Sequence, residues 1–434
     1  MAAFDVNTGV TFDPKRFLVS LFQAAVAAAD PDRIIATHLP PKPRGRTIVI
    51  GAGKGAAQMA AALEQAWPGP LEGSVVTRYG FSAPTQNIEV LEAAHPVPDE
   101  AGLRASQRLL QRVSGLTRDD LVIALICGGG SALLPAPATG LTLADEIAVN
   151  EALLASGAPI SAMNTIRKHI SAIKGGRLAA AAYPAKVVSL IVSDIPGDNP
   201  ALVASGPTIP DGSDRNDALA LIGAYGIRLP SVVMTHLKSP EANAPRPDDP
   251  CFADNEVHII ASAGVSLEAA AAASRRQGIE AVILSDAIEG EARDVGSVHA
   301  AIAREVATKQ RPFRKPVVIL SGGETTVTLK AKGKGGRNSE FLQSFALGIA
   351  GVQGIDALAA DTDGIDGSEN NAGAFCNGST VARMRSAGID AKVALADNNT
   401  WTAFQAIDDL FVPGPTGTNV NDLRAILVRE ADMC

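Results

Sequence analysis

The chain has 434 residues, 46 % of them apolar and only 4 % aromatic, and it carries a formal net charge of −8. This length exceeds what one ordinary hydrophobic core needs, so we expect roughly two to three domains, and the aliphatic, Ala-rich composition is typical of helices packed on parallel sheets rather than of a β-sandwich. The acidic balance, with no long basic run, argues against a nucleic-acid-binding surface.

The N-terminal part predicts a helix over 14–29, a buried strand over 47–50 and a helix over 57–66, with the turn GAGKGA at 51–56 between the last two. A glycine turn from a strand into a helix is where backbone N–H groups meet phosphate. It is similar to a dinucleotide fingerprint, but no acid follows the next strand (74–78) to bind a ribose 2′-hydroxyl, and Arg78 would suit a 2′-phosphate instead. A Walker A loop is excluded because no Ser or Thr follows Lys54 at the required spacing. Lys54 can still reach a phosphate as a point charge.

A second candidate ligand loop follows the strong strand predicted over 121–127. It consists of Gly128, Gly129, Gly130 and Ser131. Three successive glycines after a buried strand indicate a close approach of the backbone to another group. Crowding between helix and strand is the alternative, although one glycine would normally satisfy it. His95, in the rigid loop HPVPD, is interpreted as a packing or capping group.

Two further segments of this half carry candidate residues. A cationic helix is expected over 163–177, on which Asn164 and Lys168 lie one turn apart and can point at a carboxylate substrate, the alternative being a solvated charged face. The buried strand predicted over 187–192 leads to Asp194, with Asp198 four residues on. A carboxylate at the carboxyl end of a parallel strand can hold Mg²⁺ or take a proton, although Asx turns alone would also explain these residues.

A segment rich in Pro, Asn and Asp at 230–250 predicts a linker, so we divide the chain into domains 1–240 and 241–434. Further on, a strand over 317–320 ends at Gly322, Gly323 and Glu324. The loop 333–340 then leads into a helix N-terminus, where free N–H groups favour an anion, or it is only a flexible hairpin exit. A strand over 355–360 ends at Asp361 and Asp363, again a candidate site.

Several of these loops together resemble one family, the class II glycerate 2-kinases with a C-terminal domain of the MOFRL type. The matching segments keep their order over nearly the whole chain: GAGKGA (51–56), AAHPVPDE (93–100), CGGGSALL (127–134), MNTIRKHIS (163–171), IKGGRLA (173–179), SDIPGDNP (193–200), ASGPT (204–208), SGGETTVT (321–328), GKGGRNSE (333–340) and AADTDGIDG (359–367). The expected fold is α/β with two domains, each a mainly parallel sheet flanked by helices, the N-terminal one Rossmann-like. The resemblance implies an active site in the cleft between the domains.

The resemblance also implies ATP- and Mg²⁺-dependent phosphorylation of D-glycerate at its 2-hydroxyl, giving 2-phosphoglycerate. The family's catalytic lysine matches Lys54 and its catalytic arginine matches Arg337. Phosphoryl transfer needs positioning and charge neutralisation more than covalent groups, which suits these cations. The remaining candidates are, for the nucleotide, Gly128, Gly129, Gly130, Ser131, Gly335, Gly336 and Asn338; for Mg²⁺, Asp194, Glu324 and Asp363; for catalysis in addition, Asp194; and for the substrate, Asn164 and Lys168.

Two rival functions stay open. An NAD(P)H-dependent hydroxypyruvate reductase is supported by the GAGKGA turn, and close relatives are sometimes named so. A non-enzymatic sugar-acid sensor would explain the pockets but not the carboxylates at strand ends. Under the kinase reading the partners are glycerate and a nucleotide, with no nucleic acid or membrane, and a homo-oligomer is compatible with the sequence.

We expect a cytoplasmic protein. No apolar run approaches about 18 residues, and no basic start precedes an apolar core, so neither a membrane span nor a signal peptide is predicted. The four cysteines (Cys127, Cys251, Cys376 and Cys434) include no CxxC pair, which fits scattered reduced thiols.

Overall fold

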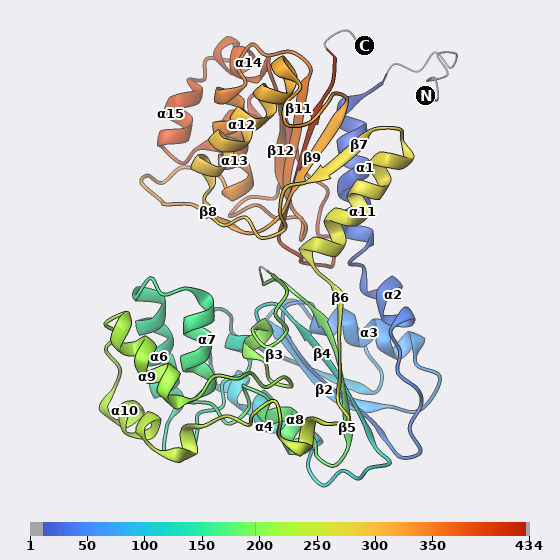
Figure 1. Cartoon of the computed structure of the whole chain (residues 1–434), viewed down its shortest axis with the longest axis vertical. Helices are drawn as coiled ribbons and strands as arrows, with labels where there is room; N and C mark the ends of the chain where they lie inside the picture. Colours follow the sequence, from blue (N-terminus) through green and yellow to red (C-terminus); the bar gives the residue numbers. More distant parts are fainter. Residues whose placement is uncertain (1–11, 196, 431–434) are drawn as a thin grey trace. The chain divides into compact units, whose positions relative to one another are not determined.

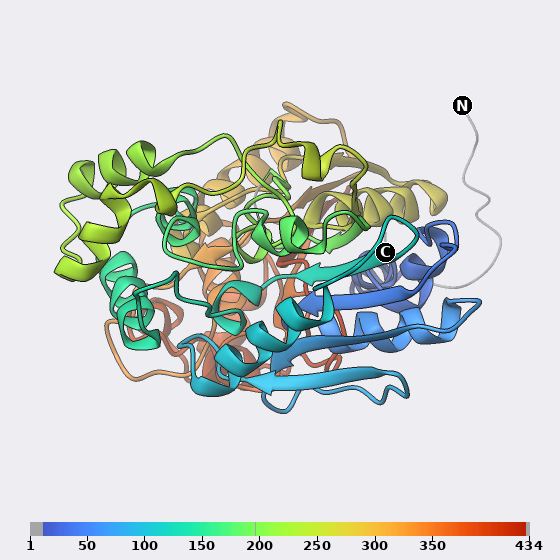
Figure 2. The same cartoon turned by 90° about the horizontal axis from the view of Figure 1, so that it is seen from below.

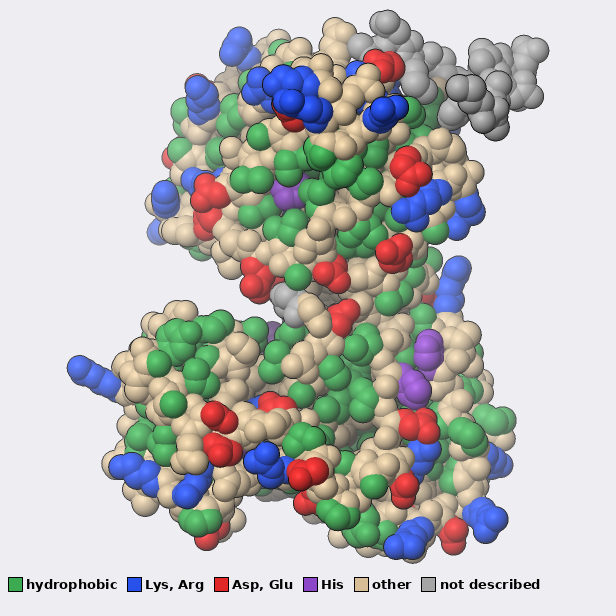
Figure 3. All heavy atoms as spheres, viewed as in Figure 1, with side chains coloured by type: hydrophobic (Ala, Val, Ile, Leu, Met, Phe, Trp, Pro, Cys, Tyr) green, Lys and Arg blue, Asp and Glu red, His purple; other side chains and the backbone are tan. Residues whose placement is uncertain are grey.

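The computed structural model describes residues 12–195 and 197–430, which form two compact units (Figure 1). The central unit runs from Asp30 to Ser262. The terminal unit combines the chain up to Ala29 with the segment from Ala263 onward. On the face drawn in Figure 3, basic and acidic side chains are interspersed over both units.

The central unit is built on a six-stranded sheet with the order β3-β2-β1-β4-β5-β6, in which every neighbouring pair is parallel (Figure 2). Strands β1 and β4 are buried along their whole length, because TIVIGA and LVIALIC are apolar on both faces, as a central parallel strand requires. The strands are β1 (Thr47–Ala52), β2 (Glu72–Arg78), β3 (Ile88–Ala93), β4 (Leu121–Cys127), β5 (Lys186–Val192) and β6 (Glu256–Ala261). This is the strand order of the Rossmann fold, so the predicted Rossmann-like α/β domain is confirmed.

Helices cover this sheet and also form a satellite core. On one face, alternate residues such as Ile48, Ile50 and Val122 pack against Leu109 and Leu178 of the helices. A separate apolar cluster, which includes Val149, Ile166, Ile222 and Val233, holds α6, α7, α9 and α10 together. The helices of the central unit are α2 (Pro31–Ile34), α3 (Ala56–Ala66), α4 (Glu100–Arg112), α5 (Gly130–Leu133), α6 (Leu143–Ala155), α7 (Ile160–Lys168), α8 (Arg177–Ala182), α9 (Arg215–Ala224) and α10 (Ser231–Lys238).

The terminal unit has a six-stranded sheet with the order β13-β12-β11-β14-β9-β7, and here the predicted mainly parallel sheet is wrong. Only β7 and β9 pair in parallel, whereas the other four pairings are antiparallel. Strands β11 and β12 are joined by a loop instead of a crossover helix, and an antiparallel pair needs no crossover. The strands are β7 (Glu280–Ile283), β9 (Val317–Ser321), β11 (Ile355–Asp361), β12 (Gly373–Asn377), β13 (Leu410–Phe411) and β14 (Asp422–Val428), with β8 (Gly290–Glu291) and β10 (Thr325–Thr326) pairing separately.

Helices cover both faces of the terminal sheet (Figure 1). Val317 and Ile319 of β9 point to the face covered by α12 and α13, whereas Val318 and Leu320 point to the face covered by α1 and α11. Because successive side chains of a β-strand point to opposite faces, β9 contributes to the apolar layers on both sides of the sheet. The helices are α1 (Pro14–Ala27), α11 (Ala263–Arg276), α12 (Ala292–Lys309), α13 (Arg337–Gly348), α14 (Thr380–Ser386), α15 (Ala391–Ala396) and α16 (Thr400–Gln405). Among the described residues, no helix combines the length and the apolarity needed to cross a membrane.

The structure divides the chain elsewhere than the predicted boundary between 240 and 241. Helix α1 buries Phe17, Leu18 and Leu21 in the same apolar cluster as Leu267 of α11, so it belongs to the terminal unit. The Pro- and Asp-rich segment that predicted a linker precedes β6, which is the last strand of the central sheet.

Candidate functional site

Two glycine-rich loops meet at one point of the central sheet. The order 3-2-1-4-5-6 reverses direction between β1 and β4, and in such sheets ligands bind outside the carboxyl ends of the strands at this switch point. The loop after β1 carries Lys54, and the loop after β4 carries Gly128 to Ser131. The fold therefore brings together the two predicted loops of this half.

Hydrogen bonds fix the backbone around Lys54. Its N–H donates to the carbonyl of Gly128 at 2.9 Å, and its own carbonyl accepts from Oγ1 of Thr77 at 3.1 Å. The next amide, of Gly55, donates to Sγ of Cys127 at 3.2 Å. Within the described residues the Lys54 ammonium forms no ion pair, so its charge is available to an anion.

The glycines after β4 allow three polar side chains to approach the backbone. A Cβ on Gly128 would overlap Oδ2 of Asp194. A Cβ on Gly129, whose φ is +79°, would lie 3.0 Å from Cγ of Lys54 and 3.2 Å from Nε2 of His95. The predicted close approach is therefore present, and the groups that approach are Asp194, Lys54 and His95.

Two groups of this region, the His95 imidazole and the Cys127 thiol, are uncharged at neutral pH. Partial burial, followed by the positive charges of Lys54 and Arg78, lowers the pKa of His95 to about 4. Burial raises the pKa of the Cys127 thiol to about 12. His95 is therefore a neutral imidazole at pH 7, and it adds no second cation beside Lys54.

Ser131 leads to a polar cluster that contains Asn164. Oγ of Ser131 lies 2.7 Å from Oγ of Ser205, which donates to Oδ1 of Asn164 at 3.0 Å. Ala204 and Ser205 have positive φ values of 52° and 61°, a strained backbone for residues other than glycine and one often found at functional sites. Sequence reasoning did not single out Ser205, although it lies in the segment ASGPT, whose match to the family was a signal.

Lys168 lies apart from this cluster. Helix α7 ends at Lys168, so the helix predicted over 163–177 is interrupted: Ser171 forms an isolated β-bridge with Pro137, and Gly175 and Gly176 adopt positive φ just before α8 begins. The buried Lys168 ammonium pairs with Asp211 and donates to Oγ of Ser213 at 3.2 Å. Burial lowers the pKa of Lys168 to about 8. The structure thus brings Asn164, but not the Lys168 ammonium, to the loop after β4.

In the terminal unit, the sheet gathers carboxylates at one edge. Strand β14 runs antiparallel to both β9 and β11, so its first residue lies at the edge where those two strands end. Arg337, the first residue of α13, contacts all three segments there. Its Nε donates to Asp422 Oδ1 and its Nη1 to Glu324 Oε1, each at 2.8 Å, and its Nη2 donates to Asp361.

The N-terminus of α13 is occupied by an internal carboxylate. The backbone N–H groups of Asn338 and Ser339 each donate to Asp366 at 2.9 Å. A Cβ on Gly336 would overlap this carboxylate, and a Cβ on Gly335 would overlap Oγ1 of Thr400. The glycines proposed for nucleotide binding are therefore explained by contacts within the unit, and the expected free helix amides are already bonded.

Burial and neighbouring charges shift the pKa values of the groups in this cluster. Three carboxylates raise the pKa of Arg337 against the opposing effect of burial, so the guanidinium stays cationic. Burial raises the pKa of Asp361 well above its usual range. Burial also raises the pKa of Asp366 to about 6, although the two helix amides favour its charged form.

Asp366 predicts a measurable pH dependence of stability. The pKa of Asp366 is higher in the folded protein than in the unfolded chain, so the folded state holds the proton more tightly. Protonated Asp366 therefore stabilises the protein fully at a pH below its unfolded-state pKa, and this stabilisation is lost as pH rises through about 6. The Asp366→Asn variant cannot titrate there. The unfolding free energy of the unaltered protein relative to this variant should therefore fall by roughly 2 kcal/mol between pH 4 and pH 7, measured by urea unfolding.

A matched control tests the sign of this effect. Asp214 caps α9, and its pKa is lowered, first by the backbone N–H of Asp217. Its stabilisation is present above the unfolded-state pKa and is lost as pH falls. Comparison with Asp214→Asn should therefore give a dependence of opposite direction. A flat difference for Asp366→Asn would contradict the raised pKa.

The three predicted metal ligands do not form one cluster. Asp194 belongs to the central unit, whereas Glu324 and Asp363 belong to the terminal unit. Glu324 is bonded to Arg337, and Oδ1 of Asp363 accepts from the backbone N–H of Ile365 at 2.8 Å. Within residues 12–195 and 197–430, no group of three or more His, Cys, Asp or Glu side chains could hold a metal ion.

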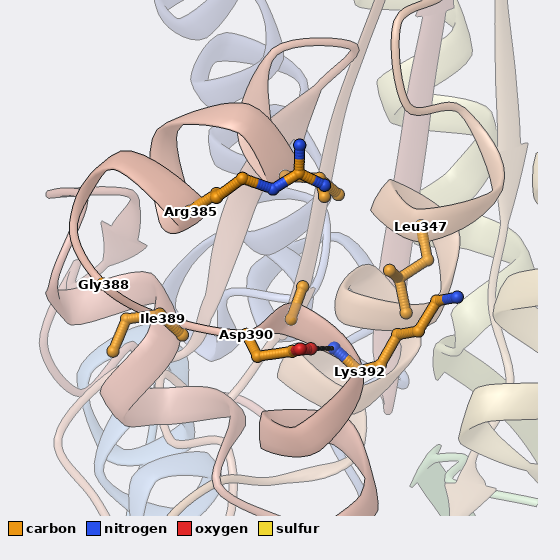
Figure 4. A pocket seen from close by; sticks show the side chains of 8 residues that line it. Leu347, Arg385, Gly388, Ile389, Asp390 and Lys392 are labelled. Atoms are coloured by element: carbon orange, nitrogen blue, oxygen red, sulfur yellow. Dashed lines mark hydrogen bonds between the residues drawn. The ribbon is translucent and has the colours of Figure 1, made fainter.

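A pocket of about 400 Å³ lies in the terminal unit near the other end of α13, where Leu347 is located (Figure 4). Arg385 and Lys392 line it, and the Lys392 backbone N–H donates to the Asp390 carboxylate at 2.8 Å. Leu347 lies ten positions beyond Arg337, about 15 Å along the helix. The pocket is therefore separate from the Arg337 cluster.

Comparisons with known proteins agree with this two-unit α/β architecture. Residues 17–238 match a domain of unknown function (DUF4147), and residues 317–422 match the MOFRL family. A D-glycerate 2-kinase of Thermotoga maritima is 38 % identical over 95 % of this chain and 98 % of its own length. A crystal structure of a glycerate kinase from Thermotoga maritima superposes with a TM-score of 0.88 at 37 % identity, covering 95 % of this chain and 99 % of that one. A protein of Agrobacterium vitis named putative hydroxypyruvate reductase is 52 % identical over 95 % of this chain and 94 % of its own length.

These findings define, first, a two-unit α/β protein with a Rossmann-type sheet in one unit and a MOFRL-type domain in the other. The chain belongs to the class II glycerate kinase family.

Proposed function

We propose that this protein is a glycerate 2-kinase that transfers the γ-phosphoryl group of ATP to the 2-hydroxyl of D-glycerate. The observation that carries the proposal is the likeness, over nearly the whole chain, to a D-glycerate 2-kinase, in a chain that has Lys54 at the switch point of its sheet. Phosphoryl transfer depends mainly on positioning and on neutralising charge. Lys54 and the backbone of Gly128 to Ser131 offer both, and Arg337 supplies the second cation.

Magnesium fits this proposal as an ion that arrives with the nucleotide. Mg²⁺ is usually held by one or two carboxylates together with phosphate oxygens, not by an all-protein cage. Asp194, beside Gly128, would supply such a carboxylate, and Glu324 and Asp363 remain the candidates of the terminal unit. The bound ion would neutralise charge on the phosphates, while Lys54 orients the transferred group.

A reductase is the second candidate, and two observations favour it. The central sheet has the strand order of dinucleotide-binding folds, and a relative from Agrobacterium vitis is named putative hydroxypyruvate reductase. Against it, β2 ends at Arg78, so no acid is present there for a ribose 2′-hydroxyl. The neutral His95, with a pKa of about 4, is a poor proton donor at pH 7.

A paired assay on the purified protein separates the candidates. One arm supplies D-glycerate, ATP and Mg²⁺ and identifies the phosphoglycerate isomer, and the other supplies hydroxypyruvate with NADH or NADPH. Formation of 2-phosphoglycerate with unchanged nicotinamide is expected. Oxidation of nicotinamide without phosphoryl transfer would overturn the proposal, and tight glycerate binding without turnover in either arm would favour a sensor.

Gly128→Ala is expected to lower the kinase activity by about 10²-fold, because the added methyl overlaps the Asp194 carboxylate and displaces it or the loop. Steady-state assays and thermal unfolding of the variant measure the two effects separately. Gly223→Ala is the matched control, since nothing lies within 4 Å of its added Cβ. Unchanged activity of Gly128→Ala would show that the spacing between this loop and Asp194 is not needed.

A further inference from the structure

The guanidinium of Arg337 is held by three carboxylates that differ in their surroundings. The side chain of Glu324 is 50 % exposed, whereas that of Asp422 is 0 % exposed. Asp422 binds Nε, the nitrogen nearest the aliphatic stem, so it sets the orientation of the guanidinium plane. With one bond on each nitrogen, two of the five N–H groups remain for a ligand, both on the outer nitrogens.

Two further buried side chains donate hydrogen bonds to the Asp422 carboxylate. Its Oδ1 also accepts from Nδ2 of Asn338 at 2.7 Å, and its Oδ2 accepts from Nη2 of Arg424 at 2.7 Å. Arg424 is fully buried, and its Nη1 donates to the carbonyl of Gly322 at 3.1 Å. The carboxylate is therefore tied both to α13 and to the segment that carries Glu324.

We propose that Asp422 is a positioning residue for Arg337, with Arg424 as its support, so that the two outer nitrogens of Arg337 are aimed at the phosphoryl group. This inference rests on the proposed kinase function. A buried carboxylate that joins two arginines on opposite sides restricts both better than an exposed one, because neither oxygen can turn to water. Asp422 acts through Arg337 and does not itself touch the reacting atoms.

Asp422→Asn keeps the shape of the side chain but removes its charge. We expect it to lower kcat for glycerate phosphorylation by roughly 10²-fold, with KM values for ATP and glycerate changed less than about threefold. Since Asp422 acts through Arg337, adding Asp422→Asn to Arg337→Lys should lower kcat little further than Arg337→Lys alone. The double-mutant cycle is the decisive readout.

Asp409 provides the matched control in the same unit. Its buried carboxylate pairs with Lys15 and Arg383. Asp409→Asn should cost similar stability, leave kcat close to that of the unaltered protein, and combine additively with Arg337→Lys.

Three outcomes overturn different claims. Absence of glycerate phosphorylation by the unaltered protein rejects the proposed function. If the unaltered protein is active but the fold-losses in kcat caused by Asp422→Asn and Arg337→Lys multiply in the double variant, the positioning role is rejected. If Asp422→Asn does not fold, Asp422→Glu keeps the charge but displaces the carboxylate by one methylene, and full activity of that variant also rejects the role.

Discussion

Replacing Lys54 by alanine is expected to lower kcat/KM for glycerate phosphorylation by about 10³-fold or more, the scale on which preorganised cations act in phosphoryl transfer. Lys54 follows β1 at the switch point, and its backbone is fixed by Gly128 and Thr77. Within the described residues its ammonium forms no ion pair, so the substitution breaks no salt bridge there. The loss should therefore appear in catalysis and leave the unfolding temperature nearly unchanged.

Lys186 provides the control for this prediction. It starts β5 in the same sheet, and its ammonium forms a partly exposed pair with Glu256. An exposed pair contributes little to stability, so Lys186→Ala should keep the activity of the unaltered protein. Full activity of Lys54→Ala in an assay that follows ADP release would remove Lys54 from the mechanism.

The central sheet could be predicted because its information is local. Strands β1, β4 and β5 are short, largely apolar runs, and helices alternate with the strands, which is typical of parallel βαβ units. Strand β3, which carries Glu89 and Glu92, was not predicted. The loops after β1 and β4 were predicted for the same reason, since Lys54 and Gly128 directly follow buried strands.

The directions of the strands in the terminal sheet could not be predicted in the same way. Whether two strands run parallel or antiparallel depends on the segment that connects them, and here that segment has the composition of a ligand-binding loop. The segment after Asp361 suggested a site, but it also serves as the link between antiparallel β11 and β12. Helix α1 was predicted correctly as an element, yet its partner α11 lies more than 200 residues away in sequence. No local sequence pattern indicates that α1 and α11 pack together.

The ion-pair and hydrogen-bond partners of the charged residues could not be predicted from the sequence either. Arg337 was predicted from its motif, but its carboxylates Asp361 and Asp422 are separated by 60 residues and meet because β14 enters between β9 and β11. Asp366 was missed because its role depends on the start of α13. Lys168 lay on the predicted helix, but burial demanded a counter-ion, and Asp211 from a later loop supplies it.

Arg337→Ala is the second large effect that we expect, and it should change both activity and stability. Under the proposed function, loss of the guanidinium would remove a charge-neutralising group from phosphoryl transfer. It also leaves Asp361 and Asp422 without one of their cations. We expect kcat to fall by about 10³-fold, and the unfolding free energy to fall by roughly 3 kcal/mol, as when a buried pair loses one partner. Kinetic assays and chemical unfolding measure the two losses.

Arg337→Lys separates these two losses. A lysine keeps the charge but offers one compact ammonium, which cannot bond three carboxylates and still present a planar fork to a phosphoryl group. Stability should therefore recover in large part while kcat stays low. Arg383→Lys is the matched control, because Arg383 also pairs with a buried carboxylate, Asp409, outside the Arg337 cluster. If Arg337→Lys regained full activity, charge alone would suffice and the geometry of the guanidinium would have no part in catalysis.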